Sequence, residues 1–148
     1  MFAEFLSRLI QPQPQRLTVS DSRLALAALL VRVARSDGSY DPEEFHRIDR
    51  ILNARYGLPP ADALALRQDA EQLEAEAPDT VRFTRAIKDA VPYEDRETVV
   101  EALWDVVLAD GIRDHEEDAL LRLVANLLGV NDRDSNMARK RVEARRNA

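Results

Sequence analysis

The sequence VARSDGSYDPEE, residues 33–44, separates two segments with helical periodicity, and VVLADGIRDHEE, residues 106–117, does the same later in the chain. At an offset of 73 residues, seven of the 21 positions from Val33 to Asn53 are identical to their counterparts. Both copies place Asp-Gly and a further acidic run between apolar helical patterns. Such self-similarity indicates an internal repeat. We therefore expect two related helix–turn–helix units, at residues 24–58 and 97–130.

Residues around the first turn predict where its helices end and begin. Apolar residues recur at helical spacing up to Asp37-Gly38, where the first helix is expected to end. Asp41, Pro42 and Glu44 then match the N-cap, N1 proline and N3 acid of a capping box, in which two side chains satisfy each other's backbone N–H groups. The second helix is expected to end at Gly57, because glycine readily adopts the left-handed conformation found after helices.

Composition favours helices throughout the chain. The 148 residues include only four glycines and 5% aromatic residues, and the seven prolines fall between periodic segments. We predict an all-α fold, with duplicated helix–turn–helix hairpins packed as a compact bundle of about seven to eight helices. Residues 1–19 are expected to form a short amphipathic helix and a Pro/Gln linker, and residues 20–148 the helical domain. In the middle of the chain, the expected inward positions are Val81, Ala86, Ile87 and Ala90.

Charge and cysteine content disfavour several classes of protein. The formal net charge is −6, and nucleic-acid affinity rests largely on basic contacts, so we expect no nucleic-acid partner. The absence of cysteine excludes disulfides and thiolate metal sites. No apolar run approaches the roughly 18 residues of a membrane span, and the first residues do not resemble a signal peptide. These features predict a cytoplasmic protein.

Two segments suggest contacts with other molecules. The amphipathic pattern of residues 1–10 would suit peripheral contact with a membrane, although a first helix docked on the domain is the simpler interpretation. A basic C-terminal helix would suit an acidic protein or an anionic membrane surface, or would simply be solvated. A protein partner is expected, while its identity and the oligomeric state are left open. The basic residues of this helix are Arg139, Lys140, Arg141, Arg145 and Arg146.

The two repeated turns concentrate carboxylates, which are the ligands that calcium and magnesium prefer. We predict that they form a site for one of these divalent cations. An EF-hand is excluded, because Pro42 and Ile48 stand where a loop starting at Asp37 needs glycine and a bidentate glutamate. The candidate metal ligands are Asp37, Asp41, Glu44, Asp110, Asp114 and Glu117.

A purely structural interpretation of the same acids stays open. N-cap and N3 acids such as Asp41 and Glu44 are favoured by capping and by the helix dipole without any ligand. Asp37 and Asp110 fit this interpretation less well, because a negative charge at the end of a helix meets the unfavourable end of the dipole. A structural role is still open to them, in which each aspartate accepts hydrogen bonds from the following turn as an Asx motif. They are the residues that discriminate between the two interpretations.

The repeated pattern resembles the TerB-like domains, which are named for tellurite-resistance proteins of bacteria. The resemblance rests on residues 33–38 with Glu44 and on residues 106–111 with Glu117, and it covers roughly residues 24–130. It implies an all-helical duplicated fold with an acidic, metal-associated surface, linked to resistance to tellurite and other chemical stress. It does not imply a reaction.

We therefore expect a non-enzymatic stress-response domain that binds a divalent cation or a partner through an acidic face. The alternative is a protein- or membrane-surface interaction module whose acidic turns are purely structural. A metal-dependent hydrolase is less favoured, because the sequence contains no H-E-x-x-H motif, no nucleophile elbow and no glycine-rich phosphate loop.

Overall fold

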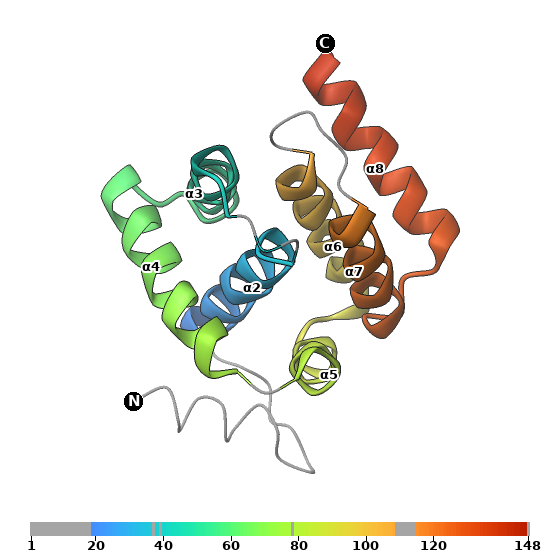
Figure 1. The fold of residues 1–148 in the computed structure, drawn as a ribbon, viewed down its shortest axis with the longest axis horizontal. Coiled ribbons are helices and arrows are strands. Elements are labelled where there is room, and N and C mark those ends of the chain that lie inside the picture. Colours follow the sequence, from blue (N-terminus) through green and yellow to red (C-terminus); the bar gives the residue numbers. More distant parts are fainter. Residues whose placement is uncertain (1–18, 37, 39, 78, 109–114, 148) are drawn as a thin grey trace.

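The computed structural model describes residues 19–36, 38, 40–77, 79–108 and 115–147. These residues form seven α-helices and no strand (Figure 1), which confirms the predicted all-α fold. The amphipathic helix predicted at residues 1–10 lies outside the described residues. The helices are α2 (Val19–Ala34), α3 (Pro42–Tyr56), α4 (Pro60–Glu76), α5 (Thr80–Ala90), α6 (Tyr93–Val107), α7 (His115–Leu127) and α8 (Asp132–Asn147).

Helix α2 is the centre of the bundle. Residues 25–31 are all buried, and a helix that is apolar on every side must be surrounded by other elements. It packs against α3 and α4 on one side, and against α6 and α7 on the other, with α5 across one end (Figure 1). The core of the protein therefore forms around this helix.

Helix α6 has the corresponding place in the second half. Nearly all of its residues from Val99 to Val107 are buried, and it packs against α7, α8, α2 and α3. The series α2–α3–α4 and α6–α7–α8 thus show the same pairwise packing, with α5 connecting them. This arrangement agrees with two related units, although their origin by duplication remains a prediction.

Glycines end two helices, and the first of these ends, at Gly57, is where the sequence predicts it. Gly57 follows α3 with φ of 63°, and Gly129 follows α7 with φ of 84°, both in the left-handed region. After α7 the Val130 N–H bonds to the Ala125 carbonyl at 2.9 Å and the Gly129 N–H to the Asn126 carbonyl at 3.0 Å. These two bonds are the Schellman pattern, and the buried Val130 side chain completes it.

The buried side of helix α5 differs in part from the predicted one. Val81 was expected to point inward, but it is 37% exposed, whereas Phe83, Thr84 and Ile87 are buried. The buried positions lie on one side of the helix, and Phe83 brings the largest apolar surface to that side. The prediction for Ile87 is confirmed. The side chains of Ala86 and Ala90 lie outside the described part of the structure.

The basic C-terminal helix lies along α6 and pairs with it. Arg141 and Arg145 approach the Glu101 carboxylate at 3.3 Å and 2.9 Å, and Arg146 approaches Asp105 at 2.7 Å. These arginines therefore bind within the molecule, which the sequence pattern did not anticipate. In the described part of the chain, none of the helices combines the length and apolar character that a membrane crossing requires.

Candidate functional site

The first acidic turn leads directly into α3. Asp41 is exposed at the N-cap with extended backbone, and Glu44 stands at N3 with only 3% of its surface exposed. The Asp41 backbone N–H donates to Oε1 of Glu44 at 3.3 Å, and the two residues form the predicted capping box. The structure thus brings these two candidate ligands together, and the role it shows for them is that of a helix cap.

The remaining candidate ligands are not placed by the structure. Asp37, Asp110 and Asp114 lie outside the described residues, and Glu117 belongs to α7 but its side chain is not described. Among the side chains that are described, no three histidines, aspartates or glutamates stand close enough together to hold a metal ion. The divalent-cation site therefore remains a prediction.

A buried arginine behind the first turn fixes α4 against α3. Arg67 is 7% exposed, and its Nε donates to Oδ1 of Asp49 at 2.6 Å while Nη1 donates to Oε2 of Glu71 at 3.2 Å. Its guanidinium carbon lies 4.7 Å from the centroid of the Phe45 ring. Burial acts to lower the pKa of Arg67, but the bonds and charges of the two carboxylates outweigh it and raise the pKa. The cluster anchors the residue that follows Glu44.

Tyr40 connects this cluster to the turn itself. Its ring lies edge-on to Phe45 at 5.6 Å between centroids, and the Arg35 guanidinium carbon lies 5.5 Å from its centroid. Burial raises the pKa of Tyr40, and the neighbouring Glu71 carboxylate raises it further. The phenol therefore stays protonated and keeps the turn packed on the α3–α4 pair.

Sequence reasoning missed this cluster, although one signal was present. The inward side of α4 is an apolar stripe of small and aliphatic residues interrupted by a single arginine. An arginine at a buried position requires carboxylate partners. The stripe consists of Ala63, Arg67, Ala70 and Leu73.

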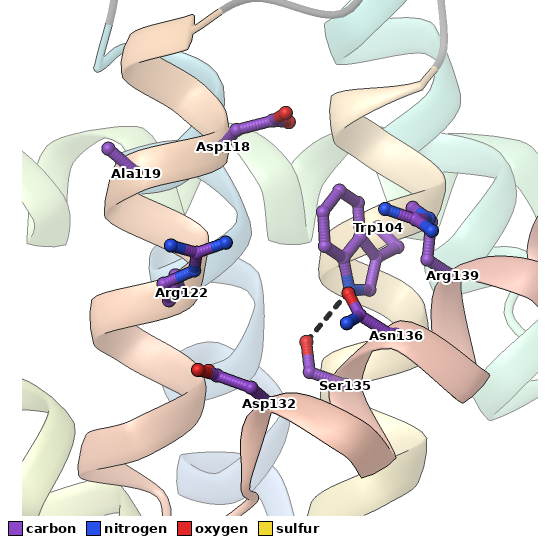
Figure 2. A pocket seen from close by; sticks show the side chains of 8 residues that line it. All are labelled: Trp104, Asp118, Ala119, Arg122, Asp132, Ser135, Asn136 and Arg139. Atoms are coloured by element: carbon purple, nitrogen blue, oxygen red, sulfur yellow. Dashed lines mark hydrogen bonds between the residues drawn. The ribbon is translucent and has the colours of Figure 1, made fainter.

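A pocket of about 390 Å³ opens between α6, α7 and α8, around the only tryptophan of the chain (Figure 2). Trp104 is 4% exposed and donates its indole N–H to the Ser135 hydroxyl at 3.1 Å. The Arg139 guanidinium carbon lies 5.8 Å from the Trp104 ring centroid. Two aspartates and two arginines line the pocket, so its formal charges balance: Asp118, Asp132, Arg122 and Arg139.

Comparison with known proteins finds a match to one protein family. The family model described as tellurite resistance protein TerB matches residues 23–140, which include most of the helical bundle. No curated protein matches the chain, and no solved structure does so either.

Proposed function

Because the chain belongs to the family of the tellurite resistance protein TerB, we propose that it is a non-enzymatic stress-response domain that acts by binding. Membership of the family relates the domain to tellurite resistance. The proposal adds that the ligand is a divalent cation held at the acidic turns. A protein partner recognised through the same acidic face is the other ligand that the proposal allows, and the cytoplasmic location expected from the sequence stays a prediction.

The burial of Glu44 is the observation that supports a cation best. A carboxylate is costly to remove from water, yet this one is 3% exposed at the base of an acidic turn. The Asp41 N–H already offsets part of that cost, and a divalent cation bound in the turn would offset more, since Ca²⁺ and Mg²⁺ take several carboxylate and carbonyl oxygens. The matching acids of the second turn would supply a second site of the same kind if the repeat is a true duplication.

A second candidate function follows from the capping box. Asp41 and Glu44 are already used to begin α3, so they are explained without a ligand. Under this alternative the acidic turns are purely structural and the domain is an interaction module for a protein or membrane surface. The discriminating residues are Asp37 and Asp110, because capping does not require them.

Thermal melting of the whole chain with Ca²⁺, Mg²⁺ or Mn²⁺ separates the two candidates. An ion that binds only the folded state raises the melting temperature in a saturable way. We expect this rise in the unmodified protein and in the control Asp69→Asn, which changes an exposed aspartate on α4. We expect its loss in the double variant Asp37→Asn/Asp110→Asn. No rise at about millimolar ion, or an equal rise in the double variant, would favour the structural turns.

The membrane form of the alternative has its own test. If residues 1–10 touch a membrane, replacing Phe2 and Phe5 by glutamate would remove the chain from anionic vesicles in a flotation assay. Equal flotation of the variant and the unmodified protein would exclude this contact.

A further inference from the structure

An arginine-rich crevice of about 430 Å³ lies where α3 and α8 meet α6. Arg47 enters it from α3, and Arg145 and Arg146 enter it from α8. Asp105 on α6 is the carboxylate among its lining residues, and Val142 completes the wall. Helix α6 lies between the other two helices in Figure 1, so the crevice joins the two halves of the molecule.

Arg146 is held firmly at one side of this crevice. Its Nη2 lies 2.7 Å from Oδ1 of Asp105, and it also donates to the backbone carbonyls of Asp105 and Leu108. Those carbonyls belong to the last turn of α6 and its C-cap, where a positive charge is favourable. The guanidinium is therefore positioned in advance, before any ligand arrives.

Arg47 is poorly compensated at the opposite side. Its Nη1 lies 3.8 Å from the Oδ1 atom that Arg146 contacts at 2.7 Å, a distance beyond a hydrogen bond. Only a quarter of its side chain is exposed, at 25%. The Nε–H groups of both arginines are buried and meet no acceptor among the described residues. Burial lowers the pKa of Arg47, repulsion from Arg146 lowers it further, and Asp105 only partly offsets this.

Positive charge exceeds negative charge along this side of α6. Within the described residues, two carboxylates form ion pairs with four guanidinium groups, which leaves two positive charges in excess. This local excess stands out on a chain whose formal net charge is −6. Arginine side chains are not deprotonated in proteins, so proton loss cannot relieve the excess. The carboxylates are those of Glu101 and Asp105, and the guanidinium groups are those of Arg47, Arg141, Arg145 and Arg146.

We propose that this crevice binds a doubly charged oxyanion, which Arg47 and Arg146 hold between them with Arg145 at the rim. The planar guanidinium of Arg47 presents paired N–H donors that match the oxygens of phosphate-like anions. Arg146 already uses its Nη2 donors on Asp105, so it adds its positive charge and its remaining Nη1 N–H. This ligand is opposite in charge to the cation proposed at the acidic turns, and its binding does not depend on that cation. Phosphate, a phosphate ester and tellurite share this chemistry, and the crevice has room for more than the anion alone.

The test is thermal melting of the whole chain with phosphate, glycerol 3-phosphate or tellurite, with chloride keeping the ionic strength constant. Tellurite does not react with thiols of this protein, because the chain has no cysteine. We expect a saturable rise in melting temperature, and the anion that gives it at the lowest concentration identifies the source of the oxyanion. A rise no larger than that in chloride alone, for all three anions, would overturn the proposal.

Variants of Arg47 separate ligand binding from a structural role. Arg47→Gln should weaken anion binding by about tenfold or more, since it removes one charged donor pair. Without added anion it should melt no lower than the unmodified protein, because it also removes repulsion from Arg146. Arg47→Lys should bind with intermediate strength. The control Arg133→Gln makes the same change of charge at an exposed position outside the crevice and should bind normally. Unchanged binding by Arg47→Gln would refute the assignment.

Discussion

Trp104 of α6 donates its indole N–H to the hydroxyl of Ser135 on α8 at 3.1 Å, and both residues are at most 4% exposed. This bond connects the two most closely packed helices of the second half, beside the ion pairs of Glu101 and Asp105. Because both partners are buried, removing one of them loses a buried hydrogen bond.

Ser135→Ala should therefore lower the free energy of unfolding by about 1–3 kcal/mol. Urea titration followed by the fluorescence of Trp104 measures this directly. Asn136→Ala is the matched control, because Asn136 is the exposed neighbour on the same helix, and its effect should stay within about 0.5 kcal/mol. Equal stabilities of the two variants would show that the bond contributes nothing.

Arg67→Ala should be more damaging, because it leaves the Asp49 and Glu71 carboxylates without their shared partner. Breaking a fully buried pair costs about 3–5 kcal/mol, and the partial exposure of the two carboxylates reduces the expected loss to about 2 kcal/mol or more. Urea unfolding measures it. Arg85→Ala, at an exposed position on α5, is the control for losing an arginine. A loss below about 0.5 kcal/mol would contradict the role assigned to Arg67.

Local signals explain why so much of the fold could be predicted. The start of α3 depends on Asp41, Pro42 and Glu44, which are adjacent in sequence, and its end depends on Gly57. Apolar residues at helical spacing likewise predicted the helix before Asp37-Gly38, and α2 buries most of those residues. These features act within a few residues of one another, so a single sequence is enough to recognise them.

The partners of Arg67 and Arg146 could not be predicted, because they are distant in sequence. Arg67 meets Asp49 across 18 positions, and Arg146 meets Asp105 across 41. A basic C-terminal helix looks the same in sequence whether it is solvated or paired with α6. Only the packing of α8 on α6 decides between these, and that packing depends on apolar contacts such as those of Ala138 and Val142.

Substitutions at Asp41 distinguish a cap from a ligand. Asp41→Ala should cost about 1 kcal/mol, because the first turn of α3 loses its side-chain acceptor. Asp41→Asn should retain most of the stability, since asparagine caps as well as aspartate, but it would weaken a cation site by removing a charge. Melting with and without Ca²⁺ compares the two variants. If Asp41→Asn keeps both its stability and its Ca²⁺ response, Asp41 is a cap alone.

Alkaline pH should destabilise the protein through Tyr40 and Tyr56. Burial is the main cause that raises the pKa of each phenol in the folded state, above the value of about 10 in an unfolded chain. The folded state therefore holds its phenol protons more tightly. This contribution to stability is complete below about pH 10 and is lost as pH rises through the folded-state pKa values.

The expected result is a free energy of unfolding that falls above about pH 10, by at most roughly 1.4 kcal/mol per pH unit for each phenol. Tyr40→Phe should flatten this decline, because phenylalanine fills the same space without a proton to lose. Tyr93→Phe is the control, since Tyr93 is 67% exposed and its loss should leave the decline unchanged. Urea unfolding at several pH values, with ultraviolet absorbance following tyrosinate formation, tests both variants. An identical decline in Tyr40→Phe and the unmodified protein would mean that Tyr40 does not carry the effect.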